Sequence, residues 1–592
     1  MKRIVFVVAL LVTALAPPVL ATAETGGRPY ASLGAAFDNV GISEAAAPGT
    51  ADLDGFGHSF VAEDLAAAGW KPGTNLTVAG TRLRLPAAAP GRPDNVVANG
   101  QRIRLHGKGS ALSFLVTSSV AAASGTGVID YADGSTRSYQ LGAPDWYSGP
   151  TDAMAVMTPR WNGPTGPSPL GMKIYSVSVP VDARKEVAAV TLPSISPTGT
   201  TPAPELHVFA LGLRPAQSRW TASWSTAIDD GLAPWQWTDR TLRMVEHTSV
   251  GGRQVRIRLD NAFGPAPLTV GHATIAVRKS GAQPAATPVT LTFGGKQQVT
   301  MPAGGQAYSD PLPFSVPAQS DLLVSLYLPG TVQFAPMHSQ GLQEMYSSAD
   351  GGGDHAADGA DFPINNLFGF WTVLSGVDVV GSGHGTVVAL GDSITDGYAS
   401  AVNGDQRWPD YLAQRLIAQR GPTAPGVANE GISGNRVLAD AFSGVPNSGN
   451  SGIKASARLD RDVLSQSGVR TVVVLEGIND VNSDASATDV IAGLKQIAAT
   501  VHSYGLHAVV GTLTPTGGWC CTTPARAAAR DQINAFIRNN GGAFDAWVDF
   551  DAAVRNPADP ETMLPQYDSG DHLHPNGAGY QAMADAIDLD QL

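Results

Sequence analysis

Three largely apolar runs in the last third of the chain constrain its fold most strongly. They cover residues 386–390, 469–475 and 508–513. A strand buried on both faces reads as a continuous apolar run, whereas a half-exposed strand alternates. Between the last two runs, apolar side chains recur at a helical period over residues 490–501, and residues 526–538 form the next predicted helix. This alternation predicts a parallel three-layer α/β domain over residues 384–592.

The preceding two thirds of the chain have a different pattern. Short apolar stretches are separated by clusters of turn residues, in a chain that contains 67 Gly and 42 Pro. Such spacing is typical of β-sandwiches. Arg214 and Pro215 mark a boundary, and residues 255–259 alternate with a period of two. We therefore predict two all-β, sandwich-like domains, over residues 30–214 and 218–380.

The first residues resemble a targeting sequence. Lys2 and Arg3 precede an apolar run over residues 4–15, and Ala21-Thr22-Ala23 fits a cleavage site for small residues. Residues 1–23 are thus predicted to be a signal peptide of a secreted protein. An uncleaved anchor is the alternative, but the run is shorter than the roughly 20 residues that span a bilayer. We expect no membrane insertion of the mature chain.

Charge and cysteine content exclude several classes of protein. The net charge of −13 disfavours nucleic acid as a partner, because phosphate contacts need clustered cations. The chain has 2 cysteines, Cys520 and Cys521, which are too few for a disulfide scaffold or a cysteine-rich zinc module. A strained vicinal disulfide and a pair of free thiols remain open for them. Their loop, with Trp519, is a candidate wall of the substrate pocket, and residues 443–452 are a second candidate rim or a solvated linker.

A serine follows the first apolar run. In Gly391-Asp392-Ser393, Ser393 is placed on the turn after a central strand, at the sheet edge where open α/β folds bind ligands. Taken alone, a helix N-cap serine is the more ordinary interpretation, because serine is a preferred N-cap residue. Near the chain's end, Asp571 precedes His574 by three residues, a spacing that lets the carboxylate orient the imidazole. Two solvated histidines in an acidic turn are the alternative.

Ester hydrolysis also needs hydrogen-bond donors for an oxyanion. Gly434 and Asn479 each follow a predicted strand, and they offer a backbone N–H and a side-chain amide. Ordinary Gly/Asn turns are the alternative for both. Paired-carboxylate chemistry is not excluded by any motif, but Asp392 and Asp480 have structural explanations within the serine site.

Together, these segments resemble the SGNH (GDSL-type) hydrolase family. The four matching blocks are Gly391-Asp392-Ser393, Gly434, Gly477-x-Asn479-Asp480 and Asp571-x-x-His574-Pro575. The first block has Ile394 where the family name has Leu. The resemblance implies a flavodoxin-like α/β/α fold, with Ser393 as nucleophile, His574 as base and Asp571 as its orienter. It also implies an oxyanion hole formed by the Ser393 and Gly434 N–H groups and the Asn479 amide, with no metal or organic cofactor.

The front modules guide the choice of substrate. Residues 30–214 look like a sandwich attached to secreted glycan-active enzymes, and residues 218–380 resemble the β-rich region before some secreted SGNH cores. Several tryptophans are candidate sugar platforms, although core burial is the more ordinary role of each: Trp70, Trp146, Trp161, Trp235 and Trp237. We expect a secreted serine esterase that removes acyl groups, most simply O-acetyl, from a polysaccharide or glycoside. A lipid esterase or lysophospholipase, and a glycan-binding protein with an inert core, are the alternatives.

Overall fold

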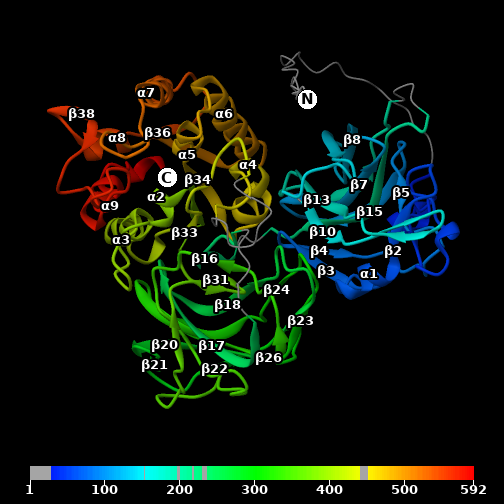
Figure 1. Ribbon diagram of the computed structural model, residues 1–592, viewed down its shortest axis with the longest axis horizontal. Helices are drawn as coiled ribbons and strands as arrows, with labels where there is room; N and C mark the ends of the chain where they lie inside the picture. The colour runs from blue at the N-terminus through cyan, green and yellow to red at the C-terminus, as the bar shows by residue number, and fades with distance from the viewer. Residues whose placement is uncertain are drawn as a thin grey trace, which may run out of the picture.

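The structure is a computed structural model that describes residues 28–152, 154–196, 201–216, 219–229, 236–383, 385–440 and 451–592 (Figure 1). The predicted signal peptide lies outside these ranges. Within them, no helix is both long and apolar enough to cross a bilayer. All-β modules come first and an α/β module follows, so the predicted fold class is confirmed.

The N-terminal module contains a sandwich of two antiparallel sheets. One sheet has the order β10-β13-β7-β15-β5 and the other the order β6-β14-β8-β9. Phe114 on the first and Ile129 on the second belong to the same buried apolar cluster. The strands are β5 (Val96–Val97), β6 (Arg102–Gly107), β7 (Ala111–Ser119), β8 (Ala123–Tyr131), β9 (Thr136–Ala143), β10 (Met154–Thr158), β13 (Met172–Pro180), β14 (Val187–Thr191) and β15 (Glu205–Arg214).

Shorter elements complete this module around a second apolar cluster that includes Trp70 and Phe209. They form a four-stranded sheet, a hairpin and a short helix. Their bounds are β1 (Ile42–Ser43), β2 (Ser59–Val61), α1 (Ala62–Ala67), β3 (Asn75–Val78), β4 (Thr81–Arg84), β11 (Trp161–Gly163) and β12 (Gly166–Ser168).

The middle module also consists mainly of two sheets. One has the order β16-β31-β18-β24, with β25 paired to β18, and the other the order β21-β20-β26-β17-β28-β29, with β22 paired to β20. The main strands are β16 (Thr221–Ser225), β17 (Trp237–Thr248), β18 (Gly252–Asp260), β20 (His272–Ser280), β21 (Gln283–Pro284), β22 (Val289–Leu291), β24 (Gln306–Tyr308), β25 (Leu312–Val316), β26 (Ser320–Val332), β28 (Met345–Ser347), β29 (Asn366–Phe368) and β31 (Leu374–Val380). Two short pairs accompany them: β19 (Leu268–Val270) with β23 (Val299–Met301), and β27 (Met337–His338) with β30 (Trp371–Thr372).

The predicted alternation over residues 255–259 is only partly correct. Val255, Ile257 and Leu259 are buried as expected, but Arg258 is buried too. Its guanidinium donates to the Ser375 carbonyl at 2.9 Å and to Gln466 Oε1 at 3.2 Å. The outer side of β18 is therefore covered by the C-terminal module rather than by water.

The C-terminal module is a parallel sheet between two layers of helices. The order β33-β32-β34-β35-β36 is the flavodoxin-like order 2-1-3-4-5. Helix α3 (Trp408–Arg420) packs on α9 (Gly577–Asp585), and α6 (Ala487–Ser503) packs on α7 (Pro524–Asn539). The strands are β32 (Thr386–Gly391), β33 (Gly426–Gly431), β34 (Val469–Leu475), β35 (His507–Gly511) and β36 (Ala546–Val548). Short helices follow several strands: α2 (Ser393–Asp396), α4 (Ala455–Arg458), α5 (Ile478–Asn482) and α8 (Phe550–Val554).

The middle and C-terminal modules share one apolar core. A single buried cluster runs from Ile257 of β18 to Val473 of β34. The contact is tight, because a Cβ atom added at Gly426 would lie 2.1 Å from the Ala222 carbonyl oxygen. The N-terminal module keeps one cluster to itself, whereas its second cluster includes Ala303 of the middle module. The middle and C-terminal modules therefore share a core, and the N-terminal module packs against the middle one, with Trp70 Nε1 donating to the Ala303 carbonyl at 2.9 Å.

A buried arginine holds the carboxyl edge of the parallel sheet together. The Arg458 side chain, at the end of α4, has no exposed surface. It donates to the carbonyl oxygens of Gly391 (2.9 Å) and Glu430 (2.7 Å) and to Asn435 Oδ1 (2.9 Å). One cation thus connects β32, β33 and the loop after β33. It also lies 3.4 Å from the buried carboxyl group of Glu476, which follows β34.

We expect Arg458→Met to destabilise the chain strongly. The change removes the cation and leaves buried acceptors unpaired, which costs about 3–5 kcal/mol when a buried ion pair loses one partner. Urea unfolding followed by circular dichroism measures the loss. Arg184→Met is the control, because Arg184 has an 89% exposed side chain and pairs with Asp182 at the surface. Equal midpoints for the two variants would contradict the role assigned to Arg458.

Candidate active site

The turn after β32 presents a serine at the sheet edge. Asp392 is the N-cap of α2, and its Oδ1 accepts from the Ile394 N–H at 2.9 Å. The interpretation of Ser393 as the N-cap is therefore wrong. A Cβ atom at Gly391 would lie 2.0 Å from Thr395 Oγ1 and 2.8 Å from the Leu475 carbonyl oxygen, so only glycine fits this turn. Ser393 is only 6% exposed, so this residue is nearly buried at the turn.

The structure brings Ser393, His574 and Asp571 together. Ser393 Oγ lies 2.8 Å from His574 Nε2, and His574 Nδ1 lies 2.6 Å from Asp571 Oδ2. The other carboxylate oxygen, Oδ1, accepts from the backbone N–H groups of His574 (2.9 Å) and Leu573 (3.0 Å). The carboxylate therefore fixes both the imidazole and the turn that carries it. The interpretation as two solvated histidines fits only His572, which is 53% exposed and pairs with Asp568.

Hydrogen bonding keeps the Asp571 carboxylate ionised. Burial alone would raise its pKa, but the hydrogen bonds from the His574 backbone, the His574 ring and the Leu573 N–H outweigh burial and lower the pKa to about 2. An ionised carboxylate at Nδ1 fixes the tautomer in which Nε2 faces the serine hydroxyl.

Candidate oxyanion donors follow the two neighbouring strands. In the sheet register, Gly391 is opposite Gly431 of β33 and Leu475 of β34, so all three strands end at one level. Gly434 lies beyond β33 with φ +79°, a conformation that favours glycine. Asn479 lies in α5 after β34, and its Nδ2 donates to the Asn435 carbonyl at 3.0 Å. That bond uses one of the two amide hydrogens and connects the two candidate donors.

The two acids next to the motif have structural roles. Asp480 accepts from the backbone N–H groups of Val437 (2.8 Å) and Leu438 (2.9 Å), and Asp392 caps α2 as described above. Burial raises the pKa of Asp392 to about 7, with a smaller contribution from the nearby Asp480 charge. Burial also raises the pKa of Glu476 well above its ordinary value. Asp392 and Asp480 stabilise the turns by accepting hydrogen bonds from backbone N–H groups.

Sequence reasoning missed an aromatic ring at this site. The Tyr398 ring lies 4.3 Å from the His574 ring, centroid to centroid, and Tyr398 is 44% exposed. The Tyr580 hydroxyl donates to the Tyr398 carbonyl at 2.7 Å, which anchors this turn on α9. Tyr398 lies only five residues after Ser393, but no periodicity or motif distinguishes it from a surface tyrosine.

The Trp519 loop adjoins the catalytic turn. A Cβ atom at Gly518 would lie 3.1 Å from the His572 ring. Cys520 and Cys521 are exposed free thiols whose sulfur atoms are 3.0 Å apart, beyond the roughly 2.05 Å of a disulfide bond. Of the other candidate rim, residues 443–450 lie outside the described part of the chain.

The candidate sugar platforms are mostly core residues. Trp70, Trp146 and Trp237 are buried, and Trp161 is half-buried under the stacked His58 ring, with centroids 3.7 Å apart. Trp235 lies outside the described residues.

One group in the described part of the chain has the spacing of metal ligands: His247, Asp321 and Asp405. Its carboxylates already accept hydrogen bonds from Arg278 and Gln343, and a neighbouring guanidinium disfavours a cation there.

The fold and the site define a serine hydrolase with a flavodoxin-like core. Residues 389–582 match the GDSL-like Lipase/Acylhydrolase family. The C-terminal region is therefore a GDSL-type acylhydrolase domain, and the chain is an ester hydrolase with β-rich modules in front of its catalytic region.

Several solved structures are similar to part of this chain. A putative lipolytic protein of the G-D-S-L family from Desulfitobacterium hafniense is 18% identical, with 34% of this chain and 97% of that chain covered and a TM-score of 0.27. An acetyl xylan esterase from Geobacillus stearothermophilus is 23% identical, with coverage of 34% and 92% and a TM-score of 0.26. A GDSL-like lipase from Bacteroides thetaiotaomicron is 20% identical, with coverage of 35% and 87% and a TM-score of 0.25. No curated protein sequence matches the chain.

We expect Asp571→Asn to lower kcat roughly 10³–10⁴-fold, because an amide at Nδ1 favours the wrong tautomer. The loss should be similar at every pH above about 4, since the pKa of Asp571 is about 2. Steady-state kinetics on a short-chain aryl ester measures it. Asp568→Asn is the matched control, because Asp568 holds His572 with the same 2.6 Å contact. An equal loss in both variants would mean that the carboxylates only hold the loop.

We expect Asp392→Asn to flatten the pH dependence of stability. The folded-state pKa of about 7 exceeds the ordinary 3.8, so stability present at low pH is lost as the pH rises through about 7. Asparagine keeps an acceptor for the Ile394 N–H and does not ionise. Between about pH 5 and pH 8, the variant should lose less stability than the wild type in thermal unfolding. Asp182→Asn, whose parent acid has a pKa of about 2, should keep the wild-type profile.

Proposed function

We propose that this chain is a secreted serine esterase that cleaves carboxylic esters through an acyl-enzyme. The observation that carries the proposal is the continuous path from Ser393 Oγ through the His574 ring to Asp571, with contacts of 2.8 and 2.6 Å. An inert core does not require a buried serine at hydrogen-bond distance from an oriented imidazole, so this arrangement favours an active esterase. Secretion rests on the composition of residues 1–23.

Each residue has one task in the proposed reaction. His574 Nε2 takes the proton of Ser393 as its Oγ attacks the ester carbonyl carbon. The N–H groups of Ser393 and Gly434 and the Asn479 amide donate to the oxyanion that forms. The C–O bond to the alcohol then breaks as the imidazolium protonates the leaving oxygen. Water, activated by the same ring, cleaves the acyl-enzyme and restores Ser393.

We assign the substrate as an acylated polysaccharide or glycoside, most simply one bearing O-acetyl groups. Support comes from the openness of the site: the Asp571 side chain is 39% exposed and Tyr398 is 44% exposed. The Tyr398 ring offers an apolar face beside the reacting centre, where a sugar ring packs well. A second exposed aromatic, Tyr147, lies near Trp161 on the N-terminal module, 6.4 Å between centroids. Both features suit a bulky glycan more than a buried acyl chain.

Acid release from a defined set of esters tests this proposal. The full mature chain would be assayed on acetylated xylan, acetylated pectin, a short-chain aryl acetate and a lysophospholipid. We expect acetate release from the glycans, and a fall of roughly 10⁴–10⁶-fold in Ser393→Ala. Ser382→Ala is the control, since Ser382 is an exposed serine that donates to the Pro422 carbonyl outside the site.

The alternatives give different results. Turnover of only the lipid or aryl ester would retain the serine chemistry and refute the glycan assignment. Activity that survives in Ser393→Ala would refute the nucleophile. A wild-type chain that is inactive on every ester but binds the glycans would favour the inert binding protein.

A further inference from the structure

The middle β module contacts the segment that follows the nucleophile Ser393. Residues 338–343, which begin in β27, run beside residues 396–407 of the hydrolase module. The contacts are His338 to Asp396, Gln340 to Ser433, the Gly341 carbonyl to Arg407, the Leu342 carbonyl to the Asn403 N–H, and Gln343 to Asp405. This segment follows the short helix α2, so the β module supports the back of the active site.

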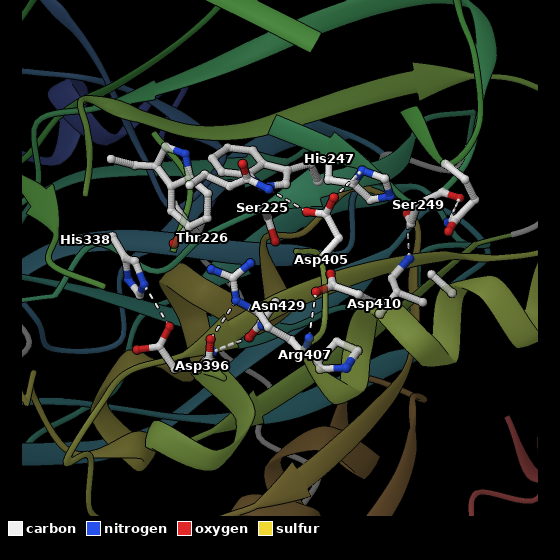
Figure 2. Close-up of a pocket in the computed structure, with 18 residues that line it drawn as sticks. Ser225, Thr226, His247, Ser249, His338, Asp396, Asp405, Arg407, Asp410 and Asn429 are labelled. Atoms are coloured by element: carbon white, nitrogen blue, oxygen red, sulfur yellow. Dashed lines mark hydrogen bonds and ion pairs between the residues drawn. The ribbon is translucent and has the colours of Figure 1, made fainter. Parts of the chain in front are cut away.

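The contact between His338 and Asp396 is almost completely buried. Figure 2 shows His338 directed at Asp396 across one side of a cavity between the two modules, and each of the two side chains is 3% exposed. Its Nε2 lies 3.0 Å from Asp396 Oδ1, and its Nδ1 lies 2.9 Å from the Ala227 carbonyl oxygen. Both partners are acceptors, so both ring nitrogens must carry a hydrogen. His338 is therefore an imidazolium.

Electrostatics agrees with this protonation state. Burial alone would lower the pKa of His338, but the Asp396 carboxylate, helped by Asp229 and opposed by Arg407, raises it above its ordinary value. The pair is thus a buried imidazolium–carboxylate contact between two modules.

Asp396 connects that cation to both halves of the catalytic site. It is the last residue of α2, which begins with Ser393. Its Oδ2 accepts from the Ser433 backbone N–H at 3.1 Å and from the Ser433 hydroxyl at 2.9 Å. Ser433 directly precedes Gly434. One carboxylate therefore ties the nucleophile helix to the loop that carries a candidate oxyanion donor.

We propose that His338 is a positioning residue of the esterase site, supplied by the middle β module, which acts through Asp396 to hold the Ser433–Gly434 loop against the nucleophile helix. This inference rests on the proposed function. Oxyanion donors act only when they are placed close to the position of the developing charge. Without His338, Asp396 is a buried unpaired charge that turns toward other donors, and the loop moves with it. Binding of the substrate's ground state does not depend on that placement, so kcat falls while KM stays.

The chain offers a matched control on the other side of the same cavity. His247 of β17 lies 3.2 Å from Asp405 Oδ2, and so it also links the β module to the hydrolase module (Figure 2). It also lies 2.8 Å from Asp321. In the described structure neither His247 nor Asp405 has a hydrogen bond to Asp396 or Ser433. Loss of His247 therefore weakens the contact between the modules without releasing the oxyanion loop.

The test compares His338→Ala, His338→Gln, Asp396→Asn and His247→Ala in the full mature chain, with thermal unfolding and steady-state kinetics on a short-chain aryl acetate. We expect His338→Ala and Asp396→Asn to lower kcat roughly 10–10²-fold with KM within about twofold. The double variant His338→Ala/Asp396→Asn should have a kcat no lower than that of the less active single variant. His338→Gln keeps one donor and should recover part of kcat. His247→Ala should lower the Tm and leave kcat within about twofold.

Several outcomes would overturn the proposal. They are an equal loss of kcat in His338→Ala and His247→Ala, a rise in KM alone, or wild-type kcat in His338→Gln, which would show that the positive charge is not needed. If His338→Ala does not fold, the His338→Gln result decides. Ser393→Ala distinguishes failure of the proposed function from failure of the positioning role. Activity that survives in Ser393→Ala refutes the proposed function. If Ser393→Ala is inactive and His338→Ala keeps wild-type activity, only the positioning role is refuted.

Discussion

The buried guanidinium of Arg458 is the contact on which the catalytic edge depends. Parallel strands leave carbonyl oxygens unpaired where they end, and a site built there needs donors that water cannot supply once the edge is buried. Arg458 bonds the ends of β32 and β33 and the Asn435 side chain, and it faces Glu476 after β34. Lysine, with a compact ammonium on a flexible stem, would not reach these separated acceptors in one plane. The planar Arg458 guanidinium therefore fixes the spacing between the Ser393 turn and the loops that carry the candidate oxyanion donors.

Several carboxyl groups lie near the Arg458 guanidinium, and burial raises the pKa of most of them. Burial raises the pKa of Asp392 to about 7 and that of Glu430 to about 8, and it raises the pKa of Glu476 well above its ordinary value. Asp571, by contrast, lies in a turn whose N–H groups lower its pKa to about 2. The site thus separates two kinds of carboxyl group. Those beneath the sheet edge have raised pKa values, and the one beside His574 has a lowered pKa.

The sequence was sufficient for the parts that local chemistry determines. The continuous apolar run over residues 469–475 coincides with β34, and the predicted helix over residues 490–501 lies within α6. The Asp571 to His574 spacing also predicted their contact. Boundaries were less accurate: the third apolar run covers residues 508–513, but β35 spans His507–Gly511. Arg458 and His338 could not be found in this way, since their roles come from partners far away in the chain and neither lies in a recognisable pattern.

The sequence pattern and the structure differ most in how they divide the chain into modules. A change from alternating to continuous apolar runs near residue 381 indicates a domain boundary, and the topology does change there. The apolar core does not follow that boundary. One apolar cluster crosses it, Gly426 packs on the Ala222 carbonyl, and Arg258 of the β module is buried against Gln466. A hydrolase core cut out at residue 384 would expose this apolar face and lose the partner of Asp396. The middle β module is therefore better regarded as part of the same packed unit as the hydrolase module, whereas the N-terminal sandwich keeps one apolar cluster entirely to itself.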